Sequence, residues 1–253
     1  MQKIETKNKF ISFLKSFTPY QITYLASAII LIIVMIGIFP NYFIEEDYLG
    51  STVLITFCVI DAISNPICEL LIAKQSKWNF IVSVLFVEVS EIVICLTLGW
   101  YATAFVTLLF WIPIDIISFV KWHKHPDQSD DNLTIVKRLK PWQTALMTAA
   151  IVIFGVTVGT LLTFIPGAAD SYLDAFAAAV GMANGLLLLF RYSEQWIAWL
   201  ITVIITIFLD ISGGMYILLI TEGAMLINTI YGMVKWYIYT KNKENDKISN
   251  PKG

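Results

Sequence analysis

Residues 116–122 read IISFVKW, and residues 229–236 read TIYGMVKW. The tripeptide Val-Lys-Trp therefore occurs twice, 114 positions apart, each time at the end of a long apolar run. A second match lies upstream, because SNPICELLIAKQSKW (64–78) resembles ANGLLLLFRYSEQW (183–196) when one gap is allowed. This alignment pairs Asn65 with Asn184 and Trp78 with Trp196. The two matches indicate an internal repeat, which is the pattern that decides the fold.

The composition of the sequence is typical of a membrane protein. Of the 253 residues, 57% are hydrophobic and 14% are charged, and the mean hydropathy is +0.72. A helix needs about 20 apolar residues to cross a bilayer. The sequence contains eight runs of this kind, so we expect transmembrane spans at 21–43, 48–73, 80–98, 101–120, 145–164, 172–190, 196–212 and 215–234.

Spans two to four and spans six to eight resemble two copies of one three-helix unit. Three spans reverse the direction of the chain, so one linker span is needed to give both copies the same orientation. We therefore expect an all-α integral membrane protein with eight helices in a 1+3+1+3 plan, similar to the SWEET sugar transporters. The expected divisions are a cytoplasmic segment (1–20), an extra helix (21–43), the first repeat (48–122), a cytoplasmic loop (123–143), the linker helix (144–165), the second repeat (172–236) and a cytoplasmic tail (237–253).

The distribution of basic residues predicts the orientation. If the N-terminus is cytoplasmic and each span crosses once, all 17 Lys and Arg residues fall on the cytoplasmic side. The opposite loops, which include NYFIEED (41–47) and PGAAD (166–170), contain none. Positive residues concentrate in cytoplasmic loops, so both termini are expected in the cytoplasm.

Acidic residues inside the spans mark the candidate site. They are Asp61, Glu69, Glu88, Glu91, Asp115 and Glu222, with Asp210 near an outer end. Charged groups are costly in a membrane and by default indicate a pathway or a binding site. No Lys or Arg is expected near mid-membrane, so these acids are protonated, accept hydrogen bonds in a polar cavity, or bind a ligand that supplies donors or charge.

Helical spacing groups some of these acids. Glu88 and Glu91 are three residues apart and share one helix face, although hydrogen bonding between helices is an alternative role. Asp61, Asn65 and Glu69 also share a face, where they could instead satisfy backbone groups freed by Pro66.

The stretch RYSEQWIAWLITV (191–203) carries a family resemblance. Trp196 and Trp199, together with the span plan and the repeated Trp-ended helices, resemble the PnuC family of vitamin and nucleoside transporters. The resemblance implies facilitated diffusion of a small ring-bearing metabolite across the plasma membrane, trapping by a cytosolic kinase, and a homotrimer. In the family pattern WxxWxxxN, an Asn follows the tryptophan pair and helps to hold nicotinamide riboside, whereas this chain has Val203. That departure favours a deoxyribonucleoside as substrate, with nicotinamide riboside, thiamine or riboflavin, or proton-coupled symport, as alternatives.

The candidate substrate-binding residues combine these signals. They are Trp196, Trp199, Glu88, Glu91, Glu222, Asn65, Asn184, Asn228, Asp61 and Tyr216. The other tryptophans considered, Trp100, Trp122, Trp142 and Trp236, are expected in the interfacial belt. Gly155 and Gly159 are expected to allow close helix packing within the chain.

Other classes of protein fit the sequence poorly. His123 and His125 are the only histidines, and they lack the spacing of a zinc site, so no metal or cofactor is expected. No nucleophile and base pair or phosphate-binding Gly-rich loop stands out, which argues against an enzyme. A retinal protein would need a lysine deep in a span, and none is expected there, so the sequence also argues against that class. The three cysteines lie inside spans and are expected to pack as small apolar residues.

Overall fold

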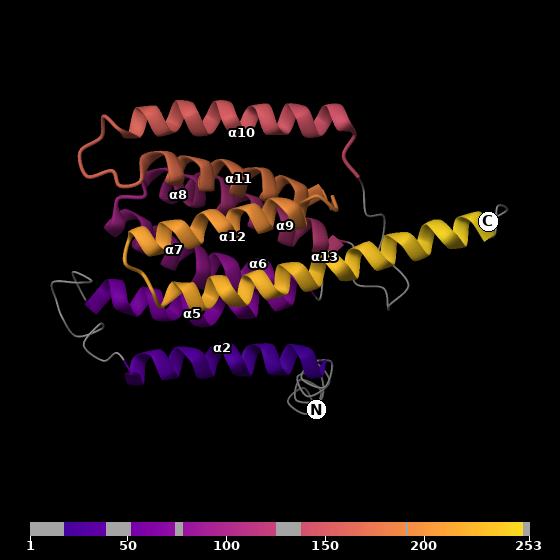
Figure 1. The fold of residues 1–253 in the computed structure, drawn as a ribbon, viewed down its shortest axis with the longest axis horizontal. Helices are drawn as coiled ribbons and strands as arrows, with labels where there is room; N and C mark the ends of the chain where they lie inside the picture. Colours follow the sequence, from indigo (N-terminus) through magenta and orange to yellow (C-terminus); the bar gives the residue numbers. More distant parts are fainter. Residues whose placement is uncertain (1–17, 39–51, 74–77, 125–137, 191, 250–253) are drawn as a thin grey trace.

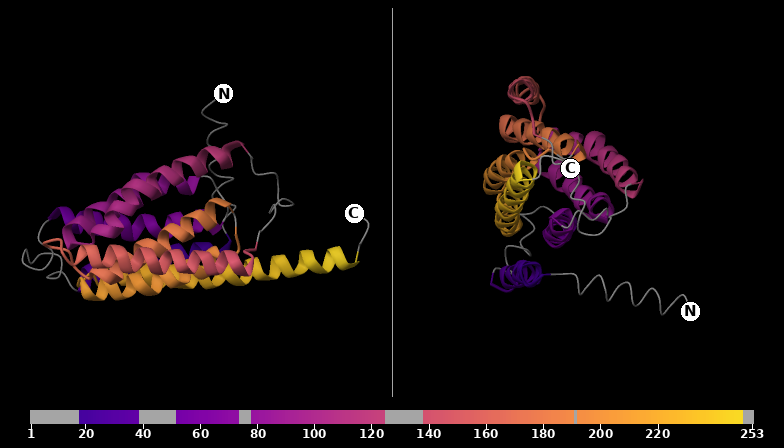
Figure 2. Two further views of the ribbon diagram at one scale, coloured as in Figure 1. Left: turned by 90° about the horizontal axis from the view of Figure 1, so that it is seen from above. Right: turned by 90° about the vertical axis from the view of Figure 1, so that its right-hand side faces the viewer.

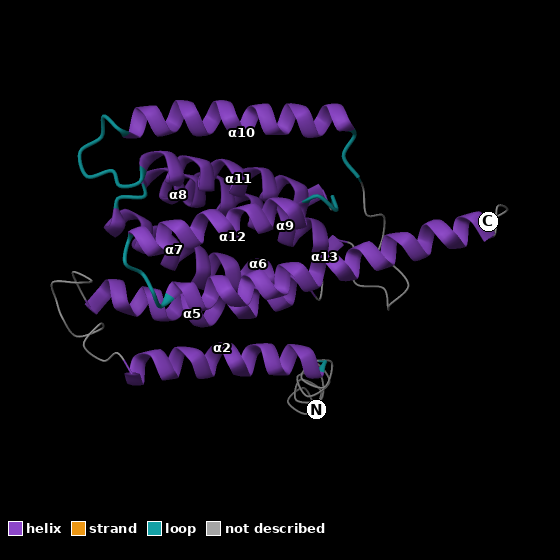
Figure 3. Ribbon diagram, viewed as in Figure 1, coloured by secondary structure: helices purple, strands orange, loops and turns teal. Residues whose placement is uncertain are grey.

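The computed structural model describes residues 18–38, 52–73, 78–124, 138–190 and 192–249, and every regular element in these ranges is a helix (Figures 1 and 3). Six helices are long and apolar enough to cross a membrane, at Thr52–Leu71, Trp78–Leu98, Tyr101–Val120, Pro141–Leu162, Ser171–Phe190 and Gln195–Ser212. Two shorter apolar helical stretches, Pro19–Val34 and Leu218–Val234, lie near the two ends of the chain. The predicted all-helical membrane fold is confirmed at this level.

Each predicted span coincides with helical structure over the described residues. The elements are α2 (Pro19–Ile38), α5 (Thr52–Ala73), α6 (Trp78–Val82), η1 (Ser83–Val87), α7 (Glu88–Leu98), α8 (Tyr101–Val106), η2 (Thr107–Trp111), α9 (Ile112–Lys124), α10 (Pro141–Leu162), α11 (Ser171–Phe190), α12 (Gln195–Ser212) and α13 (Leu218–Ser249). The predictions for the basic N-terminal segment, the loop at 41–47 and His125 concern residues outside the described ranges, as does the side chain of His123.

The helices form a bundle with α11 near its centre. Helix α11 packs between α10 and α12 and also touches α8, while α13 packs on α12 and α5 (Figures 1 and 2). Helix α2 lies at the edge against α5 and α13, and the C-terminal half of α13 extends beyond the bundle. Residues from the first and second predicted repeats therefore face one another across α5, α8, α11 and α13.

Small residues place α11 at the centre. In its apolar stretch 67% of the residues are buried, against 17% for α10. A Cβ atom added at Gly155 would lie 2.6 Å from the ring of Phe176, and one at Gly159 would lie 2.6 Å from the ring of Tyr172. Both aromatic residues belong to α11, so the predicted close packing of this glycine pair within the chain is confirmed.

Two helices of the bundle contain a π-helical turn that the sequence analysis does not predict. Segment η1 joins α6 to α7, and η2 joins α8 to α9. Turns of this kind are rare and occur frequently at functional sites. Segment η1 ends one residue before Glu88, and η2 ends at Trp111.

One end of the bundle, here called the Gly99 end, holds the turns at Gly99–Trp100, 163–170 and Gly213–Gly214. The backbone N–H of Ala169 donates to the carbonyl of Gly99 at 3.0 Å. The other end, called the Tyr192 end, holds the turn between α11 and α12.

The indole of Trp100 lies inside the bundle at the Gly99 end. It is 3% exposed, and a Cβ atom added at Gly213 would lie 2.7 Å from its ring. The prediction that Trp100 belongs to an interfacial belt is therefore wrong, because its ring is buried against Gly213 and in a cluster with Leu209 and Met215. Trp142 is 61% exposed, as expected for a residue of an interfacial belt. The side chains of Trp122 and Trp236 are not among those that the structure describes.

Candidate functional site

A cavity of about 170 Å³ lies in the middle of the bundle. Its wall comes from α5, α7, α8, α11, α12 and α13 and from both π-helical segments, so both predicted repeats contribute. The lining residues are Asp61, Asn65, Ser83, Val87, Glu88, Glu91, Ile94, Cys95, Trp100, Thr103, Trp111, Ala177, Gly181, Asn184, Trp199, Thr202, Thr206, Leu209, Asp210, Leu218, Glu222 and Met225. An engineered cavity of about 150 Å³ holds benzene, so this central cavity has room for one aromatic ring.

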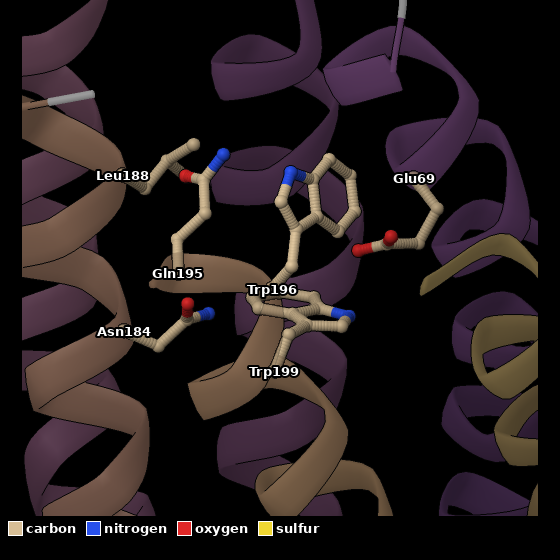
Figure 4. A pocket seen from close by; sticks show the side chains of 6 residues that line it. All are labelled: Glu69, Asn184, Leu188, Gln195, Trp196 and Trp199. Atoms are coloured by element: carbon tan, nitrogen blue, oxygen red, sulfur yellow. The ribbon is translucent and has the colours of Figure 1, made fainter. Parts of the chain in front are cut away.

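A much smaller pocket lies beside the central cavity, toward the Tyr192 end (Figure 4). It is lined by Glu69, Asn184, Leu188, Gln195, Trp196 and Trp199, and its volume of about 10 Å³ is close to that of a single water site. The two tryptophan side chains lie between the amides of Asn184 and Gln195 and the carboxyl group of Glu69. Asn184 and Trp199 line both spaces, so they form the boundary between them.

Acidic groups dominate the polar wall of the central cavity. Five of its lining residues are acidic, and none of the lining residues is Lys, Arg or His. The hydroxyl of Thr107 donates to Glu91 at 2.9 Å, and the hydroxyl of Ser83 donates to Glu88 at 3.3 Å. In a space without a cationic side chain, these carboxyl groups favour a ligand that brings donors or positive charge.

Several buried polar atoms on this wall have no hydrogen-bond partner among the described residues. They are Glu88 Oε2, Trp100 Nε1, Thr103 Oγ1, Asn184 Oδ1 and Nδ2, Trp199 Nε1, Asp210 Oδ2 and Glu222 Oε2. Buried polar groups are nearly always paired in proteins, so each such atom calls for a water molecule or a ligand. The set contains both donors and acceptors, as recognition of a polar organic molecule requires.

The small pocket is closed by contacts between helices. The side-chain amide of Asn228 on α13 donates to the carboxyl group of Glu69 on α5 at 3.3 Å. The indole of Trp196 lies directly against Gly232, where an added Cβ atom would overlap the ring. Helices α5, α12 and α13 therefore meet tightly at the Tyr192 end.

The structure brings most of the predicted site residues together. Those that line one of the two spaces are Asp61, Asn65, Glu88, Glu91, Asn184, Trp196, Trp199 and Glu222. Asn228 is fully buried behind Glu69 and lines neither space. Tyr216 is 42% exposed and lines neither space.

Several residues that line the central cavity were not among the candidates of the sequence analysis, including Trp100, Trp111, Thr202 and Thr206. Trp100 was assigned to the interfacial belt, while Trp111, Thr202 and Thr206 were not considered. Helical spacing from Trp199 could have indicated the two threonines, because they lie three and seven residues further along α12. Val203, by contrast, is 1% exposed and lines neither space, so it packs in the core.

These features define a class of protein: a helical membrane protein of at least six spans with a polar, acid-lined cavity inside the bundle. A family model described as Nicotinamide mononucleotide transporter matches residues 55–238. The chain belongs to this family of transporters, which includes the PnuC proteins, and the expectation that it is not an enzyme follows from that membership.

Individual relatives agree with this assignment. A nicotinamide riboside transporter PnuC of Haemophilus influenzae is 25% identical over 186 residues, which cover 70% of this chain and 77% of that protein. The corresponding protein of Neisseria mucosa is 26% identical over 186 residues, which cover 70% of each chain. A crystal structure of the vitamin B3 transporter PnuC matches with a TM-score of 0.70 and 21% identity, covering 90% of this chain and 94% of that one, and it supports the fold.

Proposed function

We propose that this protein transports nicotinamide riboside across the plasma membrane. The observation that carries the proposal is the central cavity, whose wall holds five acidic side chains and no basic one. Nicotinamide riboside carries a positive charge on its pyridinium ring, which complements such a wall. The names of the two PnuC relatives support the same substrate.

This proposal replaces the deoxyribonucleoside that the sequence analysis favoured. The preference rested on Val203, at the position where the family pattern has Asn. Since Val203 is buried away from both spaces, its side chain carries little information about the ligand. A neutral deoxyribonucleoside would supply hydrogen-bond donors to the carboxyl groups but no counter-charge.

The boundary between the two spaces suits the nicotinamide group. Asn184 is 1% exposed, and neither its amide oxygen nor its amide nitrogen has a partner among the described residues. A carboxamide presents one acceptor and one donor face, so it can pair with both atoms of Asn184. The neighbouring indole of Trp199 offers a surface for stacking the ring.

The transport mechanism proposed here is facilitated diffusion with alternating access. The first repeat (48–122) and the second repeat (172–236) would rock against each other around the central cavity, joined by the linker helix (144–165) in a 1+3+1+3 plan of eight spans. We further propose a homotrimer with both termini cytoplasmic and trapping of the product by a cytosolic kinase.

Uptake by purified protein in liposomes tests the function. Radiolabelled nicotinamide riboside should enter until its concentrations inside and outside are equal, faster than thiamine, riboflavin or thymidine. An imposed proton gradient should leave the final level unchanged, whereas accumulation above equilibrium would support proton-coupled symport instead. Failure to move nicotinamide riboside, with uptake of another compound of the panel, would reassign the substrate.

A further inference from the structure

The Gly99 end of the central cavity contains a polar cluster far from the tryptophan pair. On α12, Asp210 lies 11 residues after Trp199, which corresponds to about 16 Å along the helix axis. Trp100 lies at the same end, where its ring packs against Gly213. This distance is too long for one pyridinium ring to touch Trp199 and Asp210 at once.

Three carboxyl groups from different helices line the central cavity near this cluster. Asp61 comes from α5, Asp210 from α12 and Glu222 from the first turns of α13, and all three line the same space. The cluster therefore places three acidic groups in a buried setting, where a cationic ligand would favour their charged form.

The cluster has unused binding capacity. Asp210 is 1% exposed and Glu222 is 6% exposed, yet Asp210 Oδ2 and Glu222 Oε2 have no hydrogen-bond partner in the described part of the chain. The indole N–H of Trp100, 3% exposed, is unpaired in the same way. These atoms belong to buried side chains on the cavity wall, so the partners they can reach are water molecules or a ligand in the cavity.

The arrangement suits an organic cation better than a metal ion. Across the described residues, no three acidic, His or Cys side chains converge where a metal ion could be held. Carboxyl groups spread around an open space, beside the π face of an indole, instead match a flat ring with delocalised positive charge.

We propose that Trp100, Asp210 and Glu222, with Asp61 beside them, form a second binding subsite for the cationic ring of the substrate, separate from Trp196 and Trp199. This inference rests on the proposed function, since the cation is the pyridinium of nicotinamide riboside. The substrate would occupy the two subsites in turn as it passes through the cavity. The second subsite would select for charge, and the Asn184 and Trp199 boundary would recognise the carboxamide ring.

The test compares two ligands that differ mainly in charge: nicotinamide riboside and its reduced, neutral form. Their dissociation constants are measured by calorimetry for the wild type and for Asp210→Asn, Glu222→Gln and Trp100→Phe. Hydrogen bonds to charged groups contribute roughly 1.5–3 kcal/mol, so each neutralising variant should weaken binding of the cation about tenfold or more and change binding of the neutral form less than about threefold. Trp199→Ala should weaken both ligands alike.

Matched controls separate the subsite from general damage. Glu194→Gln removes an acid that lines neither space, and its amide oxygen can still accept the backbone N–H of Leu139, so the ratio of the two dissociation constants should not change. Asp210→Glu keeps the charge and should keep the preference for the cation. If a neutralising variant does not fold, as judged by melting without ligand, Trp100→Phe provides the deciding ratio.

The outcomes distinguish the inference from the proposed function. Wild-type protein that binds nicotinamide riboside and its reduced form equally well would overturn the subsite and leave the transporter proposal standing. Neutralising variants that leave the ratio of the two dissociation constants unchanged would have the same meaning. Wild-type protein that binds neither ligand would remove both proposals. Affinity for nicotinamide riboside that rises when sodium replaces potassium at constant ionic strength would assign the carboxyl groups to an inorganic cation instead.

Discussion

Asp174 shows how a single buried acid can hold a helix end in place. Its carboxylate accepts the backbone N–H groups of Ala102 at 2.7 Å and Thr103 at 2.8 Å, at the start of α8. This caps α8 from α11, and the side chain is fully buried. Asp174→Asn would replace one acceptor with a donor that faces an N–H group. We expect a loss of about 1–2 kcal/mol in the free energy of unfolding, measured as a lower melting temperature in detergent.

Asp170→Asn is the matched control for this prediction. Asp170 has a positive φ of 45°, a conformation that Asn also adopts, and it lies at the same end of α11. The control should melt within about 0.5 kcal/mol of the wild type. Equal melting of the two variants would show that the cap contributes little.

At the scale of single residues, the sequence predicted which residues line the site better than it predicted whether a tryptophan is interior or interfacial. Eight of the ten candidate residues line the two spaces, and six of the eight are acids or amides, which are costly in lipid and therefore face the interior of the bundle. Trp100 could not be distinguished from Trp142 by this reasoning, since both adjoin the end of a span. Contacts formed only on folding, with Gly213 and with the buried cluster that includes Leu209 and Met215, make Trp100 an interior residue.

At the scale of helices, the contact between α12 and α13 gives a sharp comparison of two glycines. Gly232 lies under the indole of Trp196, whereas an added Cβ atom at Gly223, on the same helix, would meet nothing within 4 Å. Gly232→Ala should cost about 1–3 kcal/mol through overpacking and displace Trp196. It should also weaken binding of nicotinamide riboside.

Gly223→Ala is the control within the same helix. Because Ala favours the helix over Gly, this variant should melt at the same or a higher temperature, by up to about 1 kcal/mol. If both variants behaved alike in melting and binding, the close approach of Trp196 to α13 would be unimportant.

Helices α5 and α13 are coupled through Glu69 and Asn228. Both side chains are at least 98% buried and share a hydrogen bond of 3.3 Å. Asn228→Leu alone should be destabilising because Glu69 loses its donor, whereas the double variant Glu69→Met with Asn228→Leu should cost less than the sum of the single changes. A double-mutant cycle on melting free energies should give a coupling of about 1–3 kcal/mol, and additive effects would contradict this pairing.

Helix positions were predictable because apolar runs of membrane length leave few alternatives to a helix. The span predicted at 101–120 corresponds to α8, η2 and α9, and that at 196–212 corresponds to α12. The π-helical turns were not predictable, since Ser83–Val87 and Thr107–Trp111 consist of ordinary apolar and hydroxyl residues. Their geometry depends on packing between helices.

At the scale of the whole molecule, the proposed orientation can be read by cysteine labelling. The native cysteines Cys58, Cys68 and Cys95 are at least 95% buried, so they should give little background. Arg138 and Pro166 are exposed at opposite ends of α10. In intact cells, a membrane-impermeant maleimide should label Pro166→Cys, and it should label Arg138→Cys only after the cells are opened. The reverse pattern would place the termini outside.

The π-helical turns have a consequence for the history of the molecule. A π turn closes between residues i and i+5, so it contains one residue more than an α turn. Trp78 and Lys121 are 43 positions apart, while their proposed counterparts Trp196 and Lys235 are 39 apart. The two turns account for two of those four additional residues, as single-residue insertions after gene duplication would. The proposed second repeat has regular α-helices in α12 and α13 where the first has η1 and η2, so equivalent side chains of the two repeats would meet the cavity in different registers.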